Sequence, residues 1–158
     1  MRIRTLGDPL LVKKSKPVIN YNDYLINLSS RMWQLMYDNH GVGLAANQAG
    51  YSESIFVYDD RQGNSGVICN PIIEPIGNSY SPKQEGCLSI PGQFHEVDRY
   101  EQVRITGNQL DGKSVEIEAK NLLSQIFQHE VDHLEGKLYI SKLPKETQMA
   151  IVLANQII

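Results

Sequence analysis

Apolar residues recur at intervals of three and four in two stretches of the chain, a spacing typical of helices that bury one face. Residues 23–39 form the first stretch, and Asn22 or Asp23 is available as its N-cap. Residues 120–135 form the second, and Gly136 is suited to end it because glycine readily adopts left-handed backbone angles. The pattern therefore predicts two helices.

Shorter apolar runs, bounded by Gly, Pro, Asn or Asp, predict strands. Two of these runs are SIFVYDD (54–60) and GVICNPII (66–73). Residues 101–110 and 113–119 are a second pair, separated by the dipeptide Asp-Gly, which favours a tight turn. We expect this second pair to form a β-hairpin.

The remaining segments show no regular period. Residues 2–18 are expected to be extended or irregular, and the Gly- and Ala-rich segment 41–50 has too little side-chain volume to pack as a strand of its own. The Ser-, Pro- and Gly-rich stretch that ends at Gly92 is expected to be irregular, except for a strand that could form around Cys87. Residues 145–156, which follow a proline, are expected to form a short last helix.

In this order, strands precede one central helix instead of alternating with helices. It predicts an α+β fold in which small mixed or antiparallel sheets surround the central helix, not a parallel βαβ sheet. A length of 158 residues suits one domain, 1–158, with a core large enough to need no disulfide.

The composition is that of an ordinary globular protein, with 41% hydrophobic and 21% charged residues. A formal net charge of -3 gives no electrostatic basis for binding nucleic acid or an anionic membrane. No apolar run is long enough for a signal peptide or a membrane span. We therefore expect a cytoplasmic protein, or an organellar one if a transit peptide has been removed.

The most specific chemical signal is a His-Glu-x-x-His pattern on the second predicted helix. His129 and His133 are four residues apart, so their imidazoles project side by side and can chelate one metal ion. Glu130 points away from the ion but can reach a water molecule that the ion activates, as a general base does. The pattern predicts a catalytic metal site.

A third ligand has to come from upstream, because no histidine follows Gly136. Asp132 and Glu135 are too close on the same helix to fold back onto the ion, although Asp132 could orient a ligand imidazole. Cys69 lies in an apolar run typical of a buried residue, whereas Cys87 is flanked by Gly, Ser and Pro. Cys87 is the best candidate, since two histidines and one thiolate suit Zn²⁺ or Fe²⁺ and leave a position open for water.

Three motifs together resemble the signature of the peptide deformylases, and they occur in that family's order. They are GVGLAANQAG (41–50), QEGCLSIPG (84–92) and QHEVDHLEG (128–136). The resemblance extends from LGDPLL, near the N-terminus, to about Leu143. It implies a hydrolase that removes the N-terminal formyl group from N-formylmethionyl nascent peptides and releases formate.

The resemblance also implies roles for individual residues. The metal ligands that it implies are Cys87, His129 and His133. Glu130 would act as general base and acid, and the side-chain amide of Gln48 and the backbone N–H of Leu88 would stabilise the oxyanion. The peptide would contact glycines that admit its backbone and apolar residues that surround the methionine side chain. These positions are Gly41, Val42, Gly43, Gly86, Leu122 and Ile126.

One divalent metal ion per chain is implied as well, with Fe²⁺ as the physiological ion and Zn²⁺ or Ni²⁺ as alternatives in the purified protein. The expected partners are N-formylmethionyl peptides, and we expect a monomer. Ribosome contact is expected to be transient and weak. Many bacterial members dock through a long basic C-terminal helix, and residues 145–158 are neither long nor basic.

Two positions depart from the family pattern. Phe94 stands where bacterial members often have an arginine that helps to hold the peptide. Gln125 occupies a stretch of helix where an apolar residue is common, which predicts a partly polar pocket edge.

The resemblance matches Glu85 to a structurally important acid, which could pair with Arg99. His40 is expected to be a surface residue.

Two other functions are compatible with these residues. A related metal-dependent amide hydrolase could remove another small acyl group, and selectivity between formyl and acetyl peptides would identify it. A non-catalytic peptide-binding metalloprotein would hold a structural ion, and such sites are usually closed by a fourth protein ligand. The sequence offers no good fourth ligand, and Glu130 would then have no role.

Overall fold

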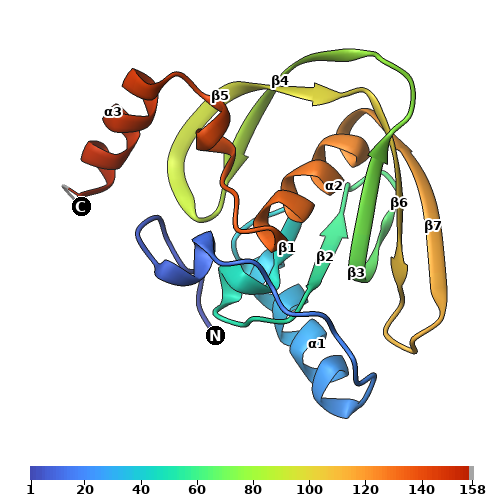
Figure 1. Ribbon diagram of the computed structural model, residues 1–158. Coiled ribbons are helices and arrows are strands. Elements are labelled where there is room, and N and C mark those ends of the chain that lie inside the picture. Colours follow the sequence, from blue (N-terminus) through green and yellow to red (C-terminus); the bar gives the residue numbers. More distant parts are fainter. Residues whose placement is uncertain (157–158) are drawn as a thin grey trace.

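Helix α2 (Asn121–Leu134) lies at the centre of the computed structural model, which describes residues 1–156 (Figure 1). A five-stranded sheet lies on one side of this helix and a two-stranded sheet on the other. All strand pairs are antiparallel. The architecture confirms the predicted α+β class. The last two residues of the predicted domain, 157 and 158, lie outside the described part of the chain.

In the described part of the chain, each sheet has an outer strand with an unpaired edge. The five-stranded sheet comprises, in spatial order, β1 (Gly43–Ala45), β2 (Ile55–Asp59), β3 (Ser65–Pro75), β6 (Gln102–Asn108) and β7 (Ser114–Lys120). The two-stranded sheet comprises β4 (Tyr80–Cys87) and β5 (Ile90–Tyr100). Within residues 1–156, β1 pairs only with β2, and β4 pairs only with β5.

Two more α-helices complete the fold. Helix α1 (Asp23–Asp38) packs its apolar face against β1 and β2, and α3 (Lys145–Gln156) projects at the C-terminal end (Figure 1). The 3₁₀ turns are η1 (Pro9–Val12), η2 (Ala46–Ala49) and η3 (Tyr139–Lys142). None of the helices in the described chain is sufficiently long and apolar to span a bilayer.

The three predicted helices and both predicted pairs of strands are confirmed. Asn22 caps α1, since its Oδ1 accepts a hydrogen bond from the backbone N–H of Leu25 at 3.2 Å. Gly136 lies just beyond α2 with a φ of 75°, and Gly112 lies in the β6–β7 turn with a φ of 85°. Capping residues and apolar spacing therefore determine these boundaries locally.

The strand that could form around Cys87 is present as part of β4, but the prediction that the rest of the stretch before Gly92 is irregular is wrong. It is largely occupied by the β4–β5 hairpin, in which Gly86 pairs with Phe94. Pro82 is tolerated because β4 is an edge strand, and one side of such a strand needs no N–H donor. Burial does alternate along β4 and β5, but the more buried face carries mostly polar residues, among them Lys83, Glu85 and Arg99, so the alternation of apolar and polar residues that identifies a half-buried strand is weak. The segment 41–50 also contains a short buried strand, β1.

Contacts on two sides fix α2 in place. Towards the five-stranded sheet, the ring of Phe127 meets the rings of Phe56 and Tyr58 at centroid distances of 5.9 and 4.9 Å. Near the end of β5, Gln128 accepts a hydrogen bond from the N–H of Tyr100 and donates one to its carbonyl, both at 2.9 Å. The helix that carries the His-Glu-x-x-His residues is therefore a rigid support.

Candidate active site

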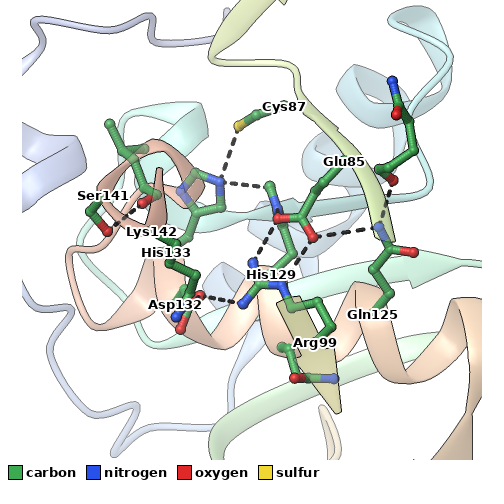
Figure 2. Close-up of polar contacts among 12 residues, drawn as sticks. Glu85, Cys87, Arg99, Gln125, His129, Asp132, His133, Ser141 and Lys142 are labelled. Carbon is green, nitrogen blue, oxygen red and sulfur yellow. Dashed lines mark hydrogen bonds and ion pairs between the residues drawn. The ribbon is translucent and has the colours of Figure 1, made fainter. Parts of the chain in front are cut away.

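Three candidate ligand atoms meet where β4 ends beside α2 (Figure 2). Cys87, the last residue of β4, has its Sγ 3.2 Å from Nε2 of His133. The Nε2 atoms of His133 and His129, one helical turn apart, are separated by 3.1 Å. The three ligand atoms all lie within 4.8 Å of one another. The fold thus brings together the three residues that the sequence predicted as ligands.

A buried carboxylate orients one of the two imidazoles. Oε2 of Glu85 accepts a hydrogen bond from Nδ1 of His129 at 2.8 Å (Figure 2). Arg99 holds the same carboxylate, donating from Nη2 at 2.6 Å and from Nε at 3.0 Å. Asp132 accepts a hydrogen bond from Nη1 of Arg99 at 2.8 Å. The expected pairing of Glu85 with Arg99 is confirmed, and Glu85, not Asp132, contacts the ligand imidazole.

The charges of these groups follow from their surroundings. Burial acts to raise the pKa of Glu85, but hydrogen bonds from His129 and Arg99 outweigh it and lower this pKa to about 2. Burial also disfavours a proton on His129, yet contacts with Cys87 and Glu85 raise the pKa of His129 above its usual range. Burial lowers the pKa of His133, whose imidazole is therefore neutral. A metal ion at Nε2 of His129 would take the place of the second imidazole proton.

This donor set fits a divalent metal ion. Imidazole nitrogen and thiolate sulfur are ligands that Zn²⁺ and Fe²⁺ bind well. A carboxylate on the far nitrogen of a ligand histidine is the usual companion of such sites, because it fixes the tautomer and the ring orientation. Glu85 stands in that relation to His129. The residues present therefore support the predicted metal site.

Glu130 lines the same cavity as Cys87 and His129, and only 3% of its surface is exposed. Among residues 1–156, no group makes a hydrogen bond to its Oε2 atom. Burial, the largest influence, raises the pKa of Glu130 to about 7. A buried carboxyl group with a free oxygen and a pKa near neutrality is suited to exchange protons with water.

Gly43 makes room for this carboxylate. A methyl group on its Cα would lie 2.7 Å from Oε1 of Glu130 and 3.0 Å from Cδ. Gly43 also lines the cavity, so its predicted position beside a peptide and its contact with Glu130 coincide. Glu130 therefore also requires that residue 43 have no side chain, in addition to the predicted approach of a peptide.

The cavity has a volume of about 280 Å³ and lies between the unpaired edges of β1 and β4. Residues 41–43 line one side and residues 84–87 line the other. Every predicted site residue lines this cavity except His133, which is buried. Leu122 and Ile126 line it and also pack in the central core. We call this cavity the cleft.

Gln48, the candidate oxyanion donor, is buried in the wall of the cleft. Its Oε1 accepts a hydrogen bond from the N–H of Ala45 at 3.0 Å, which fixes the orientation of the amide. Its Nε2 donates to Oγ of Ser89 at 3.1 Å and lies 3.5 Å from Sγ of Cys87. The amide N–H is therefore directed towards the ligand cluster, next to Leu88, which also lines the cleft.

Several features of the site escaped the sequence reasoning. His40 is exposed as expected, but it also lines the cleft. The contact between Glu85 and His129 was not predicted, although a signal existed. Residues two apart on a strand share a face, so a strand through Cys87 places Glu85 beside the ligands. The polar edge predicted at Gln125 is present, since this residue lines the cleft.

The two cysteines are expected to differ in reactivity. Cys69 is fully buried, and burial raises its thiol pKa to about 12, so the nucleophilic thiolate is scarce and shielded. Cys87 is partly exposed and lines the cleft. After metal removal by a chelator, iodoacetamide at pH 8 should label Cys87 alone, as read by peptide mass spectrometry. Denatured protein, in which both cysteines should react, is the control. Equal labelling of both cysteines in folded protein would contradict this expectation.

Comparison with known proteins gives a consistent result. A family model described as polypeptide deformylase matches residues 1–149. Peptide deformylase 1 of Corynebacterium efficiens is 40% identical over 153 residues, which cover 94% of this chain and 90% of that protein. The peptide deformylase of Caldanaerobacter subterraneus is 43% identical over 141 residues, covering 89% and 87%.

Solved structures are similar over nearly the whole fold. A peptide deformylase from Legionella pneumophila matches with a TM-score of 0.91 and 37% identity, covering 96% of this chain and 90% of that one. The peptide deformylase of Thermus thermophilus matches with a TM-score of 0.89 and 36% identity, covering 98% and 92%. Both the sequence and the fold are therefore similar to those of the same group of proteins.

Proposed function

Because the chain belongs to the polypeptide deformylase family, we propose that it hydrolyses the N-terminal formyl group of N-formylmethionyl nascent peptides and releases formate. The position of Glu130 supports this proposal most directly. Its buried Oε2, which has no hydrogen-bond partner among residues 1–156, lies in the cleft that Cys87 and His129 also line. A carboxylate in that position can take a proton from an attacking water, which a purely structural metal site would not require.

One divalent ion, held by Cys87, His129 and His133, would polarise the formyl carbonyl and make water a stronger nucleophile. Fe²⁺ is our proposal for the physiological ion, with Zn²⁺ and Ni²⁺ as substitutes. Glu85 and Arg99 would keep His129 in the tautomer and orientation that metal binding requires.

Proton transfer is assigned to Glu130. The carboxylate takes a proton from water as a new C–O bond forms at the formyl carbon. It then gives this proton to the peptide nitrogen as the C–N bond breaks, so formate and a free N-terminal amine result. A pKa of about 7 suits both directions of transfer near neutral pH.

Two donors would stabilise the negative charge that develops on the formyl oxygen. They are the side-chain amide of Gln48 and the backbone N–H of Leu88. Gln48 is held by Ala45 and Ser89, so its amide needs little reorganisation during the reaction. Losing one such fixed donor typically costs about 2.7–4 kcal/mol of transition-state stabilisation.

The peptide would lie extended between the free edges of β1 and β4. Such edges present N–H and C=O groups that can pair with an added strand. Gly41 and Gly86 line the two sides of the cleft and have no side chains that would obstruct this pairing. The methionine side chain would pack against Leu122, Ile126 and Val42, which line the apolar part of the cleft.

Formate release from a formyl-Met-Ala-Ser peptide tests the proposal. The protein would be prepared without oxygen and loaded separately with Fe²⁺, Ni²⁺ and Zn²⁺, with an acetyl-Met-Ala-Ser peptide as the control. We expect turnover of the formyl peptide only. Comparable hydrolysis of the acetyl peptide would favour a broader amide hydrolase. Absence of turnover with every fully loaded metal would overturn the assignment and favour a peptide-binding protein.

A further inference from the structure

We propose that Phe94 binds the side chain of the residue that follows the methionine, and that it thereby favours peptides with an aromatic or large aliphatic residue there. The inference rests on the proposed function, because it specifies the peptides that the same cleft would accept. It concerns a part of the cleft that is separate from the metal ligands and from the apolar residues proposed to hold the methionine.

Phe94 is a large apolar side chain at the surface of the hairpin. It lies on β5 with 65% of its surface exposed, and it lines the cleft. Its neighbour across the hairpin is Gly86 on β4. A methyl group on Gly86 would lie 2.6 and 2.7 Å from Cε1 and Cδ1 of the Phe94 ring. The ring therefore lies against the backbone of Gly86, where a side chain would otherwise be.

The pairing of β4 with β5 fixes the face on which this ring lies. Paired residues share a face, and successive residues alternate between faces. Glu85, one position before Gly86, is buried and reaches His129, so its face is directed inwards. Gly86 and Phe94 consequently occupy the outer face. Because Gly86 has no side chain, the ring extends over β4 to the cleft, which lies along the other edge of that strand.

A peptide that pairs with this free edge must follow the same alternation. If its first side chain is directed inwards, towards Leu122 and Ile126, its second side chain is directed outwards. On that face, the ring of Phe94 occupies the space above Gly86, so it is a large apolar side chain that the second residue of the peptide can contact. The next pair along this face is Gln84 with Glu96, which adds an acidic group and no cation. The surface therefore suits an apolar residue and disfavours an acidic one.

The test compares formyl-Met-X-Ser peptides in which X is Phe, Leu, Ser or Asp. An aromatic pair contributes about 0.5–1.5 kcal/mol beyond the area it buries, so kcat/KM for X = Phe should exceed that for X = Ser by roughly three- to tenfold. Phe94→Ala should bring this ratio close to one. Phe94→Tyr should retain it, and Phe94→Lys should favour X = Asp. Tyr80→Ala, which changes an exposed aromatic residue of the same hairpin outside the cleft, is the matched control and should retain the ratio.

Binding is measured in parallel, by calorimetry on zinc-loaded Glu130→Gln protein, so that the result does not depend on turnover. A preference for X = Phe in binding, lost on Phe94→Ala, would support the subsite even if no peptide were hydrolysed; that outcome would contradict only the proposed activity. Equal kcat/KM and equal affinity for X = Phe and X = Ser would overturn the subsite while leaving the activity intact. Failure of every peptide to bind or react would overturn both.

Discussion

Glu130→Gln is expected to lower kcat/KM for formyl-Met-Ala-Ser by about 10²–10⁴-fold, the usual contribution of a general acid–base group. The substitution keeps the size of the side chain and removes its ability to take up a proton. Glu130 is buried and its Oε2 has no hydrogen-bond partner within residues 1–156, so the fold should tolerate the amide. Formate release, metal content and thermal unfolding should be measured together. Loss of activity with full metal content supports the role, whereas retention of more than a tenth of the activity would contradict it.

A companion variant tests the position of the carboxylate and leaves its chemistry intact. In Gly43→Ala the new methyl group would lie 2.7 Å from Oε1, 3.0 Å from Cδ and 3.1 Å from Cγ of Glu130. The whole side chain must therefore shift, and a displacement of about 1 Å in a catalytic group can cost on the order of 10²-fold in rate. Unchanged kcat/KM in Gly43→Ala would show that catalysis does not require Glu130 to lie against Gly43.

Arg99→Met is expected to lower the free energy of unfolding by about 3–5 kcal/mol, because it removes one partner from a buried ion pair. Arg99 is 3% exposed and donates to both oxygens of Glu85 and to Asp132. Without it, the Glu85 carboxylate stays buried and keeps His129 as its strongest donor. Since Glu85 orients that ligand, zinc affinity should also fall, by about 10–100-fold.

Arg104→Met is the matched control. Arg104 also has three carboxylate partners, Glu74, Glu116 and Glu118, at 3.0, 3.8 and 3.0 Å, but it lies at the surface. Exposed ion pairs contribute little, so this variant should unfold almost like the wild type. Chemical denaturation and competitive zinc titration at pH 7 are the measurements. Equal stability of the two variants would contradict the assignment of a structural role to the buried pair.

The choice of pH matters for this comparison. The pKa of Glu85 is lowered in the folded protein from its ordinary 4.5 to about 2. Its contribution to stability is therefore fully present above about pH 4.5 and is lost as the pH falls towards 2. At pH 7 the Glu85 carboxylate is ionised, so the loss of Arg99 should have its full effect on the free energy of unfolding.

The parts of the fold that were predictable are those encoded within a few residues. The period of α2, with Gly136 beyond its end, places His129 and His133 side by side without reference to any other element. Cys87 was identified from chemistry, because a soft ligand was needed and the surroundings of Cys69 indicated burial. Each of these inferences needed only local sequence or the preferences of a metal ion.

The rest depends on contacts between segments far apart in the sequence. The β4–β5 hairpin shows no strong alternation of apolar and polar residues because its more buried face is mostly polar, and its Pro and Gly residues resemble those of a loop. The close approach of Gly43 to Glu130 joins β1 to α2, and nothing near either residue reveals it. The ring of Phe94 lies over Gly86 only because of the register of the hairpin. Such juxtapositions are consequences of tertiary packing.

Two strand edges that border the cleft are unpaired within residues 1–156, and under the proposed function they would also limit the time at which a peptide can be processed. A single extended segment can be inserted between them, whereas an N-terminus already wound into a helix, or paired in a sheet of its own, presents no free backbone groups to either edge. Processing would therefore compete with the folding of the substrate. A formylated protein whose first residues fold early would escape hydrolysis unless the cleft bound them during synthesis. The time since synthesis would therefore decide whether the formyl group is removed.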